Sequence, residues 1–98
     1  MRTKQEYIEI IDWYSPILRQ KFGIRSLCIF GSVARNEQKT DSDIDICVDM
    51  EAKMFLVVQL KRFLESILGA TVDVVRFRKN LNPFLKSEIE RDGVYIIQ

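Results

Sequence analysis

The stretch SLCIFGSVARNEQKTDSDIDICV, residues 26–48, decides how this chain folds. Its first five residues, 26–30, form an apolar run with the length of a short buried strand. Gly31 and Ser32 end this run abruptly, and residues 32–36 have room for one helical turn. The stretch therefore begins with a strand that leads directly into a tight glycine turn.

A second strand closes the same stretch. Residues 36–42 are polar and predict a loop, after which polar and apolar side chains alternate strictly over residues 43–48. A period of two is typical of a β-strand with two different faces. One face carries Asp43, Asp45 and Cys47, and the other carries Ile44, Ile46 and Val48.

The segment before this stretch predicts helix. Thr3 followed by Glu6 fits a capping box at the helix start, and Gly23 is a suitable helix end. Pro16 either kinks the helix or begins a second, short one. Apolar residues recur at helical spacing: Tyr7, Ile10, Ile11, Tyr14, Ile17 and Leu18. We expect these side chains, together with Trp13, to lie in the core.

The segment after it alternates helix and strand. Residues 53–68 carry a helical apolar stripe that stops at Gly69, and residues 71–77 read as a third strand. An asparagine and a proline open a further helix at residues 82–91. Residues 94–97 predict a last, short edge strand.

The second strand, the long helix and the third strand form a β-α-β unit, whose strands should be parallel with a right-handed crossover. The loop at residues 36–42 is long enough for the first strand to pair in either direction. The expected fold class is α/β (α+β): a single domain over residues 1–98 with a small mixed β-sheet and packed helices.

Charge and composition argue against several function classes. The chain has 15 Lys and Arg against 14 Asp and Glu, so its net charge of +1 disfavours a dedicated nucleic-acid-binding module, and we expect no direct DNA binding. No apolar run reaches the roughly 20 residues of a membrane span, and no signal-peptide pattern opens the chain. Cys28 and Cys47 lie in apolar runs without a His or a C-x-x-C nearby, which predicts reduced core cysteines and a cytoplasmic protein.

Four acids interrupt apolar or β-branched surroundings, namely Asp41, Asp43, Asp45 and Asp73, and the last three are candidate metal ligands. Asp43 and Asp45 share one strand face, and Asp73 lies centrally in the strand expected beside them. Two carboxylates about 5–6 Å apart repel by about 3 kcal/mol at an effective dielectric near 20, a cost that a divalent cation removes. Oxygen ligands without His or Cys favour Mg²⁺ or Mn²⁺ over Zn²⁺.

The alternative is that these acids are solvated side chains at a strand entrance. Asp41 in particular fits a role in ordering the loop. An EF-hand would also begin with acids at alternate positions, but Ile46 stands where its glycine would be and Ala52 where its last glutamate would be. We exclude the EF-hand. Asp73 weakens the solvated alternative without removing it, because strand interiors disfavour Asp.

The glycine turn is a candidate phosphate site. Gly31 lets the backbone approach a ligand closely, and the Ser32 hydroxyl and the following amides can donate to phosphate oxygens. Taken alone, a Gly-Ser pair after a strand is also an ordinary turn. It is not a Walker A loop, because no G-x-x-x-x-G-K-[ST] is present.

The glycine turn and the aspartates together form a more specific pattern than either feature alone. Residues 31–45 read G-S-x10-D-x-D, which resembles the signature of the DNA polymerase β-like nucleotidyltransferase superfamily. The strings FGSVAR, residues 30–35, and DSDID, residues 41–45, resemble its minimal nucleotidyltransferase branch. Asp73 stands where the third superfamily carboxylate belongs. The resemblance covers nearly the whole chain, and no motif position departs from the pattern.

This resemblance implies a role for each matched residue. Asp43 and Asp45 would hold two Mg²⁺ ions, and Asp73 would complete the catalytic metal site and take the proton of the attacking hydroxyl. Gly31 and Ser32 would bind the β- and γ-phosphates. In two-metal transfer, one ion activates the attacking oxygen and the other steadies the leaving pyrophosphate.

Three further features have two interpretations each. Arg35, just past the glycine turn, either belongs to the nucleotide-binding site or is a surface arginine. Arg76, Arg78 and Lys79 are interpreted as a solvated basic patch rather than a site. The apolar residues 54–58 form a wider cluster than one helix stripe needs, and we expect core there rather than a partner surface.

The resemblance also implies a function. Minimal nucleotidyltransferases occur as antitoxins of HEPN-type toxins, which are helical ribonucleases that they inactivate by adenylylating a tyrosine. We therefore expect Mg²⁺-dependent transfer of AMP from ATP to a HEPN-type toxin protein. Two alternatives stay open: neutralisation by binding alone, and transfer to a small molecule, as aminoglycoside nucleotidyltransferases do.

Overall fold

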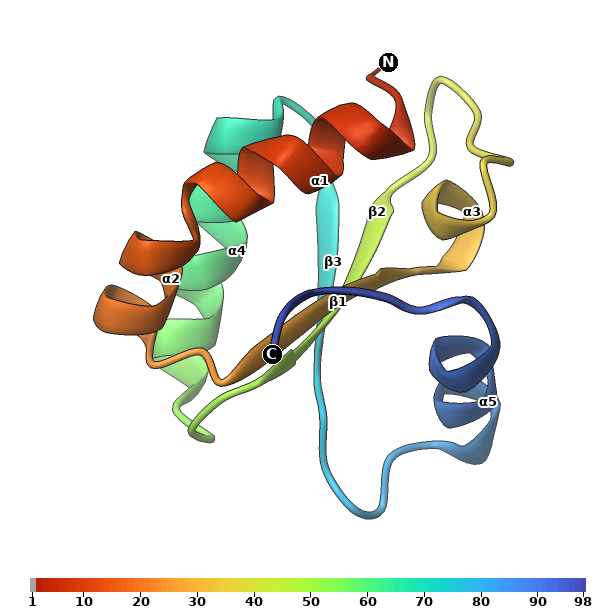
Figure 1. Ribbon diagram of the computed structural model, residues 1–98. Helices are drawn as coiled ribbons and strands as arrows, with labels where there is room; N and C mark the ends of the chain where they lie inside the picture. Colours follow the sequence, from red (N-terminus) through yellow and green to blue (C-terminus); the bar gives the residue numbers. More distant parts are fainter. Residues whose placement is uncertain (1) are drawn as a thin grey trace.

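The structure, a computed structural model that describes residues 2–98, is built on one four-stranded sheet (Figure 1). Its elements follow in the order α1 (Lys4–Trp13), α2 (Ser15–Phe22), β1 (Ser26–Phe30), α3 (Gly31–Ala34), β2 (Ile44–Asp49), α4 (Met54–Leu68), β3 (Val72–Arg76), α5 (Pro83–Asp92) and β4 (Val94–Ile97). The alternation of helix and strand predicted from the sequence is confirmed, with boundaries that differ by one or two residues.

The sheet is mixed. Its strand order is β3-β2-β1-β4, with β2 and β3 parallel and β1 antiparallel to both of its neighbours. The parallel β2-α4-β3 unit was expected from the connecting helix. The sequence left the direction of β1 open, and the loop after α3 turns the chain back so that β2 runs against β1.

Two apolar layers cover the sheet. Helices α1, α2 and α4 lie over one face, whereas α5 lies over the other (Figure 1). The larger core, beneath the first three helices, takes its strand side chains from Leu27, Ile29, Ile44, Ile46, Val48, Val72 and Ile97. The smaller cluster, beneath α5, contains Cys28, Phe30, Cys47, Leu81 and Ile89. The period of two in each strand separates these sets, because successive side chains point to opposite faces.

The helix ends follow local chemistry. The Glu6 amide donates to Thr3 Oγ1 at 3.2 Å and the Thr3 amide donates to Glu6 Oε1 at 3.0 Å, which completes the predicted capping box. Pro16 lies in the first turn of α2, so it begins a second helix rather than kinking the first. Gly23 ends α2 with a left-handed φ of 65°, as predicted.

The core prediction was wrong at five apolar positions. Trp13 and Ile17 are 80% and 45% exposed, and Met54, Phe55 and Val58 are 83%, 76% and 44% exposed. Helical spacing gives the direction of an apolar stripe, but not how wide a stripe the sheet can cover. In α4 the fully buried side chains are Leu60, Leu64 and Leu68, and further apolar side chains of the helix are only partly covered.

The two cysteines are buried and free, as predicted, and they face each other across β1 and β2. No helix within residues 2–98 is long and apolar enough to cross a membrane.

Two truncations on the same helix test which face of α4 carries the core. Leu60→Ala removes a fully buried side chain and should lower the free energy of unfolding by about 3 kcal/mol, since it leaves a cavity. Val58→Ala, at an exposed position, should change it by less than about 0.5 kcal/mol. Urea unfolding followed by circular dichroism measures both, and equal losses would contradict the assignment of the faces.

Candidate active site

One end of the sheet gathers the predicted site residues. Because β1 runs against β2, the last residue of β1, Phe30, pairs with Asp45 near the start of β2. The glycine turn that follows Phe30 therefore lies against the start of β2. Because β3 runs parallel to β2, Asp73 pairs with Asp45 across the other side. The topology thus brings the glycine turn and two of the three predicted carboxylates together.

Asp45 and Asp73 belong to the face that α5 covers. They alternate with Ile44, Ile46 and Val72, which point into the larger core. Neighbouring strands lie about 4.8 Å apart, so residues paired in a parallel ladder present their side chains in one row. The pairing of Asp45 with Asp73, which was an assumption at the level of the sequence, is therefore present in the structure.

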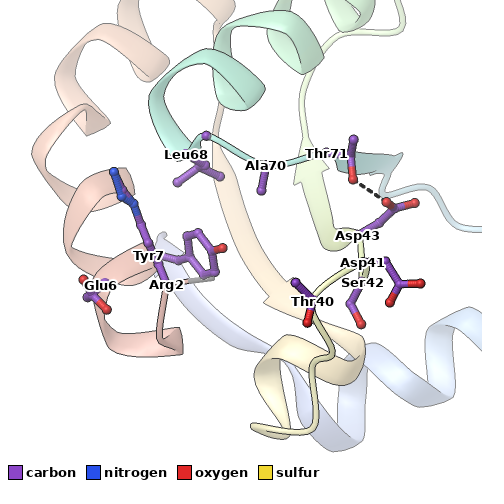
Figure 2. Close-up of a pocket in the computed structure, with 11 residues that line it drawn as sticks. Arg2, Glu6, Tyr7, Thr40, Asp41, Ser42, Asp43, Leu68, Ala70 and Thr71 are labelled. Carbon is purple, nitrogen blue, oxygen red and sulfur yellow. Dashed lines mark hydrogen bonds between the residues drawn. The ribbon is translucent and has the colours of Figure 1, made fainter.

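Asp43 lies just outside this row. The strand prediction was shifted by one residue, since β2 begins at Ile44 and leaves Asp43 in the loop before it. Its carboxylate accepts a hydrogen bond from the Thr71 hydroxyl (Figure 2), and the Ile44 amide donates to the Thr71 carbonyl at 3.0 Å. These contacts fasten the starts of β2 and β3 to each other.

The half-buried Asp45 has a pKa well above that of an ordinary aspartate. Burial is the largest cause that raises the pKa of Asp45, and the negative charges of Asp73, Glu88 and Asp43 raise it as well. Together, and against the opposing positive charge of Arg35, they bring the pKa to about 6. The acids nearest the glycine turn are therefore mutually repulsive at neutral pH, and a bound cation would relieve that repulsion.

Gly31 lies directly against the Asp45 side chain. Its φ of 74° lies in the left-handed region, and a Cβ added to it would overlap Asp45 Oδ2 and lie 3.1 Å from Asp45 Cγ. A residue with a side chain would meet both a backbone penalty and a clash. The turn can approach the carboxylate only because position 31 has no side chain.

Arg35 is held by acids rather than left free. Its Nε lies 3.0 Å from Glu37 Oε2, and its Nη1 lies 3.1 Å from Asp92 Oδ2. Asp92 is nearly buried and also accepts from Arg91 at 2.9 Å, so the guanidinium ties the end of α3 to the end of α5. The role of Arg35 in nucleotide binding stays a prediction. In this geometry the residue orients the helix that follows the glycine turn.

Two contributors from α5 were missed in the sequence. Glu88 acts on Asp45, and Asp92 holds Arg35. They lie four residues apart and so share one helix face. That spacing was visible in the sequence, but nothing there indicated that this face would meet the start of β2.

A cavity of about 820 Å³ opens beside Asp43 (Figure 2). It lies between the start of α1, the loop before β2 and the turn that joins α4 to β3. Three acids, Glu6, Asp41 and Asp43, line it together with Arg2. Its volume lies in the range of roughly 300–1,000 Å³ that is typical of small-molecule sites.

The donor set fits a hard divalent cation. Asp43, Asp45 and Asp73 supply carboxylate oxygens only. The raised pKa of Asp45 reflects burial first and then the negative charges around it, which Arg35 offsets only in part. Within residues 2–98, no three His, Cys, Asp or Glu side chains are already closed around one point. One carboxylate oxygen of Asp43 accepts the hydrogen bond from the Thr71 hydroxyl instead.

Comparison with known families agrees with this geometry. Residues 14–98 match the family described as polymerase beta, nucleotidyltransferase. The chain belongs to this nucleotidyltransferase family.

Individual nucleotidyltransferase relatives match over almost the entire chain. A Methanocaldococcus jannaschii protein named "Putative protein adenylyltransferase MJ1217" is 40% identical, over 98% of this chain and 100% of its own length. "Protein adenylyltransferase MntA" from Thermococcus cleftensis is 36% identical, over 98% of both proteins.

Two solved structures share the fold. One, described as "Structure of putative minimal nucleotidyltransferase", has a TM-score of 0.74 and 30% identity, over 95% of both chains. Another, described as "Crystal structure of the toxin-antitoxin with AMP-PNP", has a TM-score of 0.70 and 22% identity, over 87% of this chain and 71% of that one.

A pair of glycine variants separates backbone strain from the contact with Asp45. Gly31 and Gly23 both have a positive φ, but only a Cβ at Gly31 meets a neighbour. Gly23→Ala should cost about 1 kcal/mol of unfolding free energy from its left-handed backbone alone. Gly31→Ala should cost about 2 kcal/mol more because Asp45 must move. Thermal unfolding compares the two variants, and equal losses would exclude the close approach.

The acid cluster should make the metal-free protein less stable as pH rises. The folded pKa of Asp45, about 6, exceeds its ordinary value of 3.8, so the folded protein holds more protons than the unfolded chain between these values. The contribution of Asp45 to the free energy of unfolding therefore falls from about pH 4 to about pH 6. In EDTA, Asp45→Asn should flatten this fall and stabilise the protein at pH 7, whereas the exposed control Asp12→Asn should not. Urea unfolding across this pH range measures the slope, and an unchanged slope in Asp45→Asn would refute the assignment.

Proposed function

We propose that this nucleotidyltransferase transfers AMP from ATP to a hydroxyl of a partner protein, and that it acts in this way as the antitoxin of a toxin–antitoxin pair. The single observation that supports the chemistry best is the pairing of Asp45 with Asp73 directly beside the Gly31 turn. The relatives named as protein adenylyltransferases support the choice of donor and acceptor class. The similar fold seen in a toxin–antitoxin structure with AMP-PNP fits the choice of partner.

The acceptor we favour is a tyrosine of a HEPN-type toxin. Its hydroxyl oxygen attacks the α-phosphorus of ATP, a new O–P bond forms, and the bond from the α-phosphorus to the bridging oxygen breaks. Pyrophosphate leaves, and the hydroxyl proton passes to the Asp73 carboxylate. Gly31 and Ser32 bind the β- and γ-phosphates and keep the leaving group in line with the attack.

Asp43, Asp45 and Asp73 would hold two Mg²⁺ ions, which supply charge neutralisation for the attacking and leaving oxygens. The remaining work belongs to the protein. Asp45 is ionised when a cation offsets its neighbours, and Arg35 orients the helix that follows the phosphate turn. Two buried free cysteines and a requirement for ATP fit a cytoplasmic enzyme.

ATP labelled at either the α- or the γ-phosphate tests this proposal. The protein is incubated with Mg²⁺ and with the protein that co-purifies with it from its native host. Label from the α-phosphate, but not from the γ-phosphate, should appear on the partner. Asp43→Asn with Asp45→Asn should reduce the labelling at least a hundredfold, whereas the exposed control Asp12→Asn should retain it.

Other labelling results would indicate a different reaction or no reaction. Label from the γ-phosphate would indicate phosphorylation. A stable complex without label from either position would favour neutralisation by binding alone. Mass spectrometry of the labelled partner then tests the tyrosine.

The cavity beside Asp43 favours a second candidate, transfer to a basic small molecule. Three of its lining residues are acidic, which suits an amine-rich acceptor such as an aminoglycoside. Kanamycin is the probe, and release of pyrophosphate from ATP by the protein alone is the measurement. Release that depends on kanamycin would support this candidate, and its absence alongside labelling of the partner would exclude it.

A further inference from the structure

The outer edge of β3 is open. β3 is the terminal strand of the sheet and pairs only with β2 among residues 2–98. The Thr71 carbonyl accepts from β2, and the Phe77 amide donates to the Val48 carbonyl at 2.7 Å, so the odd-numbered residues of this segment direct their backbone groups toward β2. By alternation, Val74 and Arg76 direct theirs away from the sheet.

A third residue of β3, Val72, also directs its backbone amide away from the sheet, but this amide already has a hydrogen-bond partner. The Val72 amide donates to Glu65 Oε2 of α4 at 3.0 Å, which closes the beginning of the edge. The open part is therefore the two residues Val74 and Arg76. An exposed strand edge of this kind is a template for pairing with an extended chain.

A groove of about 490 Å³ runs along this part of the edge. Met54 and Val57 from the beginning of α4 form one wall, Leu81 and Leu85 from the region of α5 form the other, and Val74 lies between them. Met54 is 83% exposed although it is apolar. A strand added to β3 would direct successive side chains to opposite faces, so both walls would receive apolar side chains.

The far end of the groove is basic. Lys53, Arg76 and Arg78 line it there, at the end of β3 away from the catalytic carboxylates. Lys53 lies 3.5 Å from Glu51, but both side chains are exposed, so this pair is weak. Neither Arg76 nor Arg78 forms an ion pair with another described residue. The positive charge at this end of the groove is complementary to an acidic segment of a partner.

The groove continues from the site already described. Val74 directly follows Asp73, and Arg76 lies about 7 Å further along the strand at roughly 3.3 Å per residue. An extended segment paired with Val74 and Arg76 would therefore have one end beside Asp73 and the other beside Arg76 and Arg78.

We infer that this groove binds an extended segment of the partner protein, apolar in its middle and acidic at the end near Arg76 and Arg78, by adding it as a strand to β3. The positive charges of Arg76 and Arg78 favour acidic residues at one end of the segment. The two apolar walls favour apolar residues in its middle. The pairing brings a hydroxyl at the other end of the segment to Asp73. Only this last step rests on the proposed transfer of AMP to a protein.

Synthetic hexapeptides test the groove without the unknown partner. The probes are the acetylated and amidated peptides EEVLVY and YVLVEE, so that both strand directions are sampled. The controls are KKVLVY and YVLVKK, and versions of the acidic probes that are N-methylated at alternate residues. Binding to the ¹⁵N-labelled full chain is followed by amide chemical shifts and by hydrogen exchange, with no nucleotide present.

At least one acidic peptide should bind at least tenfold more tightly than its lysine counterpart and its N-methylated version. It should slow hydrogen exchange at Val74 and Arg76 at least tenfold. Arg76→Glu with Arg78→Glu should weaken binding at least tenfold. The charge-matched control Lys61→Glu with Arg62→Glu, on exposed α4 positions outside the groove, should not. The N-methylated probe keeps the test valid if a variant fails to fold.

Three results would overturn the inference. They are equal affinity for acidic and basic peptides, shifts that map to another surface, and a dimer of the free protein with Val74 and Arg76 already protected. The labelling reaction separates this inference from the proposed function. If the KM for the co-purified acceptor is unchanged in Arg76→Glu with Arg78→Glu, the docking groove is excluded while transfer stands. If peptides bind as expected and no protein accepts AMP, transfer is excluded while the groove stands.

Discussion

Repulsion between carboxylates at the beginnings of β2 and β3 is the constraint on which the rest of the structure depends. Asp45 and Asp73 are paired across parallel strands, Glu88 approaches from α5, and Asp43 lies one residue before the strand. Burial adds to the cost, because the charged form of Asp45 loses part of its solvation. A protein of this size has only a small margin of stability with which to offset such a site. The apolar core beneath α1, α2 and α4 supplies that margin on the opposite face of the same strands.

Strand β2 contributes both to the apolar core and to the carboxylate site, because its side chains alternate between the two faces of the sheet. Ile44, Ile46 and Val48 are buried in the larger core, whereas the residues between them point to the other face. A shift of one residue in the pairing of β2 with β3 would exchange the two sets and bury the carboxylates in the core. The register that positions Asp45 beside Asp73 is thus fixed by the same isoleucine and valine side chains that stabilise the fold. Site and core are specified by a single strand.

This coupling explains how much the sequence could predict. The alternation over residues 43–48 and the glycine turn at Gly31 carry local information, so the strands, the turn and the identity of the acids were visible. The direction of β1 relative to β2 could not be predicted, because the long loop between them allows parallel and antiparallel pairing. Exposure of Trp13 and Phe55 also escaped prediction, since helical periodicity says which way a side chain points but not what lies there. The α5 acids were missed for the same reason: their approach to the site is a property of tertiary packing alone.

The two acids of helix α5 act in opposite directions on the packing of that helix. Glu88 adds negative charge near Asp45 and so disfavours the docked helix when that carboxylate is ionised. Asp92 accepts from Arg35 and Arg91 and so favours it. The apolar contacts of α5 with the sheet come from a small cluster, to which the helix itself contributes Ile89 and Leu85. With so little apolar burial, the balance of charge has a large share in deciding how firmly α5 packs. A cation held by Asp43, Asp45 and Asp73 would remove the unfavourable part and leave the Arg35–Asp92 pair unopposed, so that charge neutralisation at the site also tightens the helix that covers it.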